Sequence, residues 1–133
     1  EDVVTRERSL PKVPVATNLG YKPEHVQTVL RAMQGVTTEG TSARVFAGAG
    51  YESGGKTGTA QLASIAQDAK YDAEALDERL RDNAMYIGYA PYDNPSIMIA
   101  VALENAGGGG ANAAPIARQM MDYYFSAGVN QHE

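Results

Sequence analysis

The spacing of apolar residues predicts two amphipathic helices, one near each end of the chain. The first is expected to begin at Pro23 and to end near Gly35. Its apolar positions recur at helical spacing and are expected to be buried: Val26, Val29, Leu30 and Met33. The second helix is expected to stop before Gly128. Its expected buried face consists of Ile116, Ala117, Met120 and Tyr124.

Between these helices the pattern predicts strands. Residues 85–90 and 96–103 predict two strands that the loop 91–95, with a proline at each end, joins as a hairpin. Residues 97–103 are apolar throughout, so the second strand is expected to lie inside the sheet with helices covering it. Around Lys56 the neighbouring glycines disfavour a helix, and we expect an extended segment there.

Two further helices are expected. The segment 41–47 predicts a short one. A charged segment predicts another, with Asp72 as its N-cap, Tyr71 and Leu76 as a hydrophobic staple, and Leu80 on the same face as Leu76. The mixed angular positions of the acidic residues in this segment favour a solvated helix face over a metal cluster.

These elements predict an α+β (α/β) fold, in which helices flank an antiparallel sheet. At 133 residues the chain is one domain or part of one. Residues 1–20 mix charges with prolines and are expected to be a connector or an edge segment. Residues 21–127 are expected to form the folded part, and residues 128–133 a tail.

Composition narrows the classes of function. Eleven basic against sixteen acidic residues give a net charge of −5, which argues against a nucleic-acid partner. Without cysteine there are no disulfides and no thiolate metal sites. Neither His25 nor His132 has a set of partners for a metal, so we expect no metal and no cofactor. The longest apolar run, residues 97–103, is far shorter than the roughly twenty residues of a membrane-spanning helix. Any membrane anchor or export signal is therefore expected outside this sequence.

The segment with the clearest chemistry is residues 54–61, with the sequence GGKTGTAQ. Taken from Gly50, the chain satisfies the phosphate-loop pattern G-x-x-x-x-G-K-S/T. Such a loop follows a buried strand and opens a helix at its lysine. Residues 43–47 are too short and too polar for that strand, and Gly58 is a poor residue for the first helical turn. Nucleotide binding is therefore an unfavoured alternative.

Taken from Lys56, the same segment contains K-T-G, a motif of penicillin-recognising serine enzymes. The surrounding chain resembles the C-terminal part of the transpeptidase domain of class B penicillin-binding proteins, and within that class the elongation-type penicillin-binding protein 2. The resemblance covers about residues 20–126. It includes the K-T-G segment, the charged insert, the hairpin 86–105 and the glycine run 107–110 before the last helix.

The resemblance implies a partial transpeptidase domain with a fold similar to that of the serine β-lactamases. It implies a peptidoglycan D,D-transpeptidase, which cross-links stem peptides ending in D-Ala–D-Ala through a serine acyl-enzyme. β-Lactam antibiotics acylate the same serine. It further implies a location at the periplasmic face of the bacterial inner membrane. The implied protein partners are the membrane proteins of cell-wall elongation.

The resemblance also implies roles for four residues. Lys56 is the implied catalytic cation, which attracts the terminal carboxylate of the substrate and contacts the serine of the S-x-N motif. Thr57 and Thr59 offer hydroxyl groups to that carboxylate. The backbone N–H of Thr59 is the implied second donor of the oxyanion hole. Gly58 lets the substrate backbone approach the strand closely.

The other two motifs of the family are expected to be missing. Ser9 and Lys12 satisfy S-x-x-K on paper, but Pro11 between them opposes a continuing helix, and the pair lies too close to Lys56. No serine is followed two positions later by asparagine, as S-x-N requires. We therefore expect this chain alone to be inactive. A fragment related to a serine β-lactamase and a non-catalytic binding module remain the alternatives.

Overall fold

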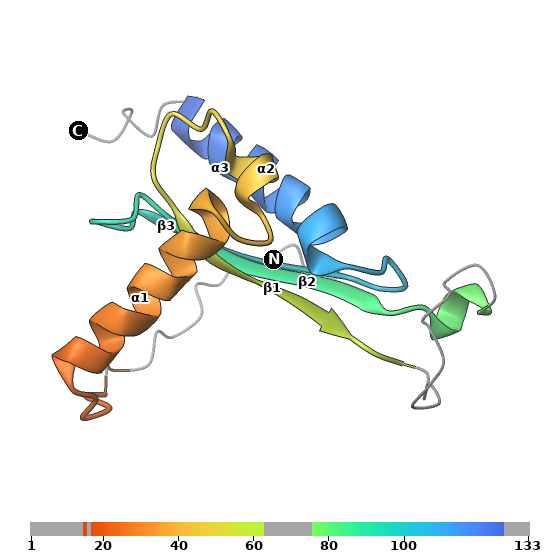
Figure 1. Cartoon of the computed structure of the whole chain (residues 1–133), viewed down its shortest axis with the longest axis horizontal. Helices are drawn as coiled ribbons and strands as arrows, with labels where there is room; N and C mark the ends of the chain where they lie inside the picture. Colours follow the sequence, from red (N-terminus) through yellow and green to blue (C-terminus); the bar gives the residue numbers. More distant parts are fainter. Residues whose placement is uncertain (1–14, 16, 63–75, 127–133) are drawn as a thin grey trace, which may run out of the picture.

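The computed structural model describes residues 15, 17–62 and 76–126, in which helices pack against one sheet (Figure 1). This architecture confirms the predicted α+β fold with an antiparallel sheet and flanking helices. Most of the predicted connector and all of the predicted tail lie outside the described residues. The elements are, in order, α1 (Pro23–Thr38), α2 (Ala43–Phe46), β1 (Gly54–Ala60), the 3-10 turn η1 (Glu78–Leu80), β2 (Asn83–Ala90), β3 (Ile97–Leu103), the π-helical turn η2 (Gly109–Ala113) and α3 (Ala114–Ser126).

The three strands follow one another across the sheet in the order β1-β2-β3, and both pairs are antiparallel. The predicted hairpin is therefore confirmed. Lys56 lies opposite Ile87, which lies opposite Ala100, so these three side chains share one face of the sheet. Thr57 lies opposite Tyr86, and both side chains lie on the other face of the sheet.

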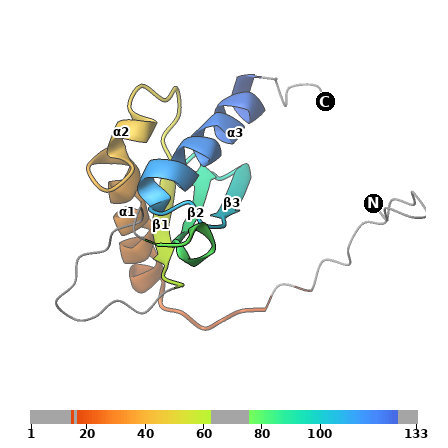
Figure 2. The ribbon, with the colours of Figure 1, turned by 90° about the vertical axis from the view of Figure 1, so that its right-hand side faces the viewer.

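The second face carries the hydrophobic core. Tyr86 and Ile99 of the sheet belong to one buried cluster with Ala117 and Met121 of α3. The ring of Phe46, at the end of α2, stacks on the ring of Tyr86 at a centroid distance of 5.9 Å. Figure 2 shows α3 above the sheet, with α1 and α2 near β1. Burying a side chain as large as Met121 stabilises the fold by about 1.5–3 kcal/mol.

The glycine run before α3 brings the backbone of η2 onto the sheet. A Cβ atom added to Gly109 would collide with the backbone of Gly58 in β1 and of Met85 in β2. One added to Gly110 would lie 2.9 Å from the carbonyl oxygen of Thr41. Only glycine allows so close an approach of two backbones.

The first predicted helix forms, but its apolar stripe is not buried as predicted. α1 continues past Gly35 to Thr38, and Thr37 is its buried residue. Val29, expected in the core, is 58% exposed. The reason is that α1 reaches the rest of the described structure at its C-terminal end, while its N-terminal end projects away from the sheet (Figure 1). Periodicity identified the apolar face of α1 without showing what covers it.

The last predicted helix also forms, with a different buried face. Met121 is fully buried, whereas Met120 is 50% exposed and Ile116 is exposed as well. The buried positions of α3 are Ala114, Ala117 and Met121. The helix approaches the sheet through its alanines, because small side chains permit a short distance between helix and strand. Met121, one turn further along, then lies against the core.

The predictions for one strand and for one helix need correction. β3 was expected inside the sheet, but it lies at an edge of the described sheet, and Met98 is 80% exposed. The face of β3 that carries Met98 is open within residues 15, 17–62 and 76–126. The helix expected around Asp72 falls largely on residues 63–75, which lie outside the described residues. Residues 78–80 form a 3-10 turn instead of an α-helix. The short helix expected at 41–47 is confirmed as α2.

Candidate functional site

The K-T-G motif lies on an extended strand, as predicted from its glycines. β1 spans Gly54–Ala60 and pairs with β2 alone within the described sheet. Lys56 is exposed in the middle of this strand. A phosphate loop would open a helix at that lysine. The nucleotide-binding alternative is therefore wrong for this segment.

Two tyrosines of β2 explain why glycines precede the lysine. A Cβ atom added to Gly54 would lie 2.6 Å from the ring and hydroxyl of Tyr89. One added to Gly55 would collide with the hydroxyl of Tyr86. Burial raises the pKa of both tyrosines. The rings cover the bare backbone of β1, so these two glycines are a packing requirement of the strand.

The predicted site residues divide between the two faces of β1. Lys56 lies on the open face, opposite the exposed Ile87, and its Nζ donates to the carbonyl oxygen of Thr57 at 2.5 Å. Thr57 and Thr59 lie on the other face, because they follow at alternate positions. Thr57 is half-buried and Thr59 is exposed. The lysine and the two threonine hydroxyls therefore lie on opposite faces of β1.

One neighbour of the motif was not predicted from the sequence. The Oγ1 atom of Thr41, in the turn between α1 and α2, lies 3.0 Å from Oγ1 of Thr57. These residues are 16 positions apart. No local pattern marks Thr41, because the contact exists only once α1 has packed beside β1. The pair links the motif strand to the turn that precedes it.

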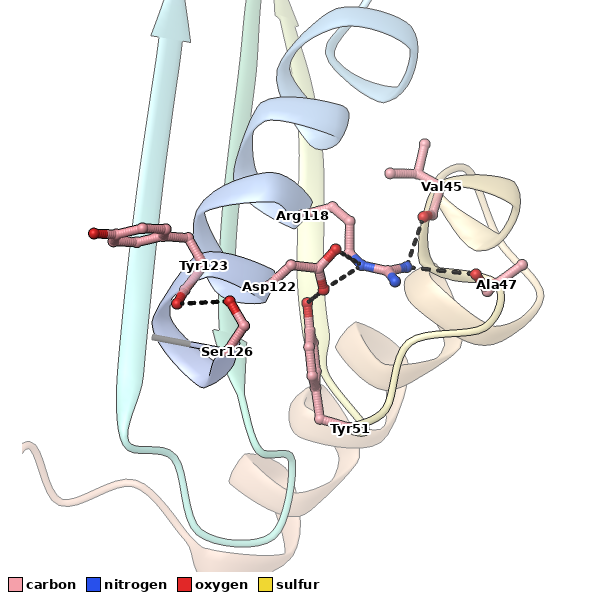
Figure 3. Close-up of polar contacts among 7 residues, drawn as sticks. All are labelled: Val45, Ala47, Tyr51, Arg118, Asp122, Tyr123 and Ser126. Carbon is pink, nitrogen blue, oxygen red and sulfur yellow. Dashed lines mark hydrogen bonds and ion pairs between the residues drawn. The ribbon is translucent and has the colours of Figure 1, made fainter. Parts of the chain in front are cut away.

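A second polar cluster holds α3 against the segment that leads into β1 (Figure 3). The Nε atom of Arg118 lies 2.8 Å from both carboxylate oxygens of Asp122. Tyr51 donates its hydroxyl to the same carboxylate at 2.9 Å. Arg118 also donates from its Nη1 atom to the carbonyl oxygens of Val45, at 3.0 Å, and Ala47. Sequence reasoning missed this cluster, since Tyr51 and Asp122 are 71 positions apart.

The charged and polar groups of this cluster compensate one another. Burial alone would raise the pKa of Asp122, but the hydrogen bonds from Arg118 and Tyr51 outweigh it and lower that pKa. Burial, and then the hydrogen bond to Asp122, raise the pKa of Tyr51 well above its usual range. The guanidinium of Arg118 also lies 5.9 Å from the ring centre of Phe46. Because these groups satisfy one another, the cluster is structural rather than catalytic.

Metal sites and membrane-spanning helices are two further classes of functional feature. The described parts of the chain contain no group of three His, Asp or Glu side chains placed to hold a metal ion. Nor does any helix within them have the length and apolar character needed to cross a membrane. Ser9 and Lys12, rejected above as a catalytic pair, lie outside the described residues.

Comparison with known proteins gives the family. Residues 5–122 match the penicillin binding protein transpeptidase domain. The chain belongs to this family. Over 94 residues it is 49% identical to the peptidoglycan D,D-transpeptidase MrdA of Haemophilus influenzae. That match covers 71% of this chain and 14% of the relative, so the chain spans a small part of the relative's length.

Solved structures agree with this assignment to the transpeptidase domain. The penicillin-binding protein PBP2 of Pseudomonas aeruginosa, in complex with WCK 5153, superposes with a TM-score of 0.68 at 29% identity. The superposition covers 96% of this chain and 25% of that one. A complex of PBP2 and MreC from Helicobacter pylori has a TM-score of 0.65 at 21% identity, over 79% of this chain and 18% of that chain. It supports the fold alone. The resemblance to the PBP2 type, inferred from the sequence, is confirmed.

Proposed function

We propose that this chain is the C-terminal part of the transpeptidase domain of an elongation-type peptidoglycan D,D-transpeptidase. The intact protein cross-links stem peptides ending in D-Ala–D-Ala through a serine acyl-enzyme, and β-lactams acylate it. The observation that carries the proposal is the extended strand β1, which exposes Lys56 at the edge of the described sheet. The family and the curated relatives support the reaction class.

In this proposal each residue of the motif has one task. The ammonium group of Lys56 attracts the terminal carboxylate of the substrate and contacts the serine of an S-x-N motif. The hydroxyls of Thr57 and Thr59 donate to the same carboxylate. The backbone N–H of Thr59 is the second donor to the oxyanion, and losing one such donor typically costs about 2.7–4 kcal/mol in the transition state. Gly58 leaves room for the substrate backbone.

The nucleophile and the general base belong, in this proposal, to a longer protein. Two observations support this: the chain spans 14% of its Haemophilus relative, and its sequence contains no S-x-N triplet. We infer that the 133-residue chain alone forms no acyl-enzyme. We further propose that the intact protein acts at the periplasmic face of the inner membrane, with membrane proteins of cell-wall elongation as partners. The structural neighbour from Helicobacter pylori is itself in complex with a second protein, MreC.

A fluorescent penicillin tests the proposal in the full-length protein that contains this chain. We expect stable covalent labelling of the full-length protein and none of the 133-residue chain. Lys56→Ala is expected to slow labelling by at least about tenfold, because one positioned charge is lost from the site. Lys22→Ala, which removes an exposed lysine just before α1, is the matched control and should label normally.

Three other outcomes would contradict the proposal. Labelling of the isolated chain at Ser9 would place the nucleophile inside this sequence. Rapid release of hydrolysed penicillin would favour the β-lactamase alternative. A full-length protein that never labels would favour a non-catalytic binding module.

A further inference from the structure

The hydroxyl of Thr57 has a partner that belongs to no motif. Thr41 Oγ1 lies 3.0 Å away, within hydrogen-bond distance, and either oxygen can be the donor. Thr41 is exposed, so its side chain does not serve the core. Among the described residues its hydroxyl makes no other hydrogen bond, whereas Thr28, Thr37 and Thr38 all donate to backbone carbonyl oxygens. The contact with Thr57 is therefore the feature of Thr41 that needs an explanation.

The turn that carries Thr41 is held on both sides. Before it, the amide of Gly40 donates to the carbonyl oxygen of Gly35 at 2.8 Å. After it, the amide and the hydroxyl of the buried Ser42 both donate to the carbonyl oxygen of Val36, at 3.1 and 3.0 Å. The backbone of Gly110 lies against Thr41 from the other side. These contacts hold the backbone at Thr41, so the side chain starts from a defined position beside β1.

The chemistry of hydroxyls decides the direction of this hydrogen bond during recognition. A threonine hydroxyl has one proton to donate and two lone pairs that accept. An ionised carboxylate only accepts. If Thr57 donates its proton to a carboxylate, it has none for Thr41, and the proton between the two oxygens must come from Thr41. A hydroxyl that accepts one hydrogen bond also becomes a better donor in the next.

We propose that Thr41 is a positioning residue for carboxylate recognition. Its O–H donates to Oγ1 of Thr57, which directs the Thr57 proton away from the turn and toward the edge of β1. The ligand class concerned is an acyl donor with a free carboxylate, whether a stem peptide or a penicillin. The inference rests on the proposed function, in which Thr57 contacts that carboxylate.

The test compares a penicillin with its carboxylate methyl ester on the full-length protein, with acylation followed by intact-mass spectrometry. Thr41→Val keeps the shape of the side chain and removes the hydroxyl. We expect it to slow acylation by the free acid about 3- to 10-fold, the range of one ordinary hydrogen bond. The ester is neutral where the acid is charged, so its acylation rate should change by less than about twofold. Thr41→Ser should restore the wild-type ratio of the two rates.

A double-mutant cycle identifies the route of the effect. If Thr41 acts through Thr57, the variant with both Thr41→Val and Thr57→Val should be no slower than Thr57→Val alone. Thr38→Val, on the exposed face of α1 three positions earlier, is the matched control and should leave both rates unchanged. Thr41→Ala provides the same comparison if Thr41→Val fails to fold.

Equal slowing of the acid and the ester, additive effects in the cycle, or no effect of Thr41→Val would each overturn the inference. The last result, together with slow labelling of Lys56→Ala, would leave the proposed function intact. If the wild-type protein is not acylated at all, the proposed function fails and the inference fails with it.

Discussion

Gly55, the residue before Lys56, lies against the hydroxyl of Tyr86. Tyr86 is 1% exposed and lies in the centre of the core, stacked on Phe46. Its ring cannot move aside without disturbing that core, because protein interiors are closely packed. The conformation of the motif strand therefore depends on the absence of a single methyl group at position 55.

We predict that Gly55→Ala destabilises the protein by about 1–3 kcal/mol, the usual cost of an added methyl group in a packed core. Thermal unfolding of the full-length protein measures the change. Gly50→Ala is the matched control, because a Cβ atom at Gly50 would meet no atom within 4 Å. Equal melting temperatures for the two variants would show that the ring of Tyr86 moves aside at little cost.

At the scale of elements, α3 is fastened to the segment before β1 by the Arg118–Asp122–Tyr51 cluster. The cluster joins residues that are more than seventy positions apart. An arginine suits this place, because its planar group donates in several directions at once and stacks on rings. The motif strand thus takes its starting position partly from the C-terminal helix.

This cluster predicts a specific dependence of stability on pH. The folded-state pKa of Asp122 lies below the ordinary value of 3.8. Its contribution to stability is therefore complete above that value and is lost as the pH falls through the lower folded-state pKa. Because the side chain is 46% exposed, we expect less than about 1 kcal/mol. Melting temperatures measured between pH 6 and pH 2 should fall less steeply for Asp122→Asn than for the wild type.

The exposed Asp93, in the hairpin loop, provides the control. Asp93→Asn should follow the wild-type curve across the same range of pH. A curve for Asp122→Asn that parallels the wild type would show that the ion pair contributes nothing measurable.

Elements were easier to predict than their surroundings. The hairpin and both long helices follow from periodicity, because that pattern is local to each segment. The buried face of α3 did not follow, since the choice of Met121 over Met120 depends on how the alanines meet the sheet. The extended form of β1 followed from its glycines. Thr41 could not be predicted, because its partner is distant in sequence and no pattern connects the two.

For the whole molecule, the main feature is apolar surface without cover in the described residues. The open face of the sheet carries Ile87 and Met98, and the projecting end of α1 carries Val26 and Val29. Apolar patches of this kind are uncommon on soluble monomers, and they normally mark a surface that is covered in the functional protein. We expect the remainder of the proposed transpeptidase to cover this apolar surface.

We therefore predict that the isolated 133-residue chain binds the dye 1-anilinonaphthalene-8-sulfonate strongly, because the dye fluoresces on exposed apolar surface. Replacing Ile87 and Met98 with serine should reduce the fluorescence at least about twofold in the isolated chain. In the full-length protein the same pair should lower the melting temperature instead. Weak dye binding by the wild-type chain would contradict this view of the open face.

The contact of Gly109 with the backbones of β1 and β2 has a mechanical consequence. The backbone of η2, which leads into α3, rests directly on the two strands, with no side chain of Gly109 between them to absorb displacement. A load applied to the C-terminal helix would reach the strand that carries Lys56 through this contact between backbones. Stretching the molecule from that end should disturb the lysine's surroundings before the hairpin begins to separate.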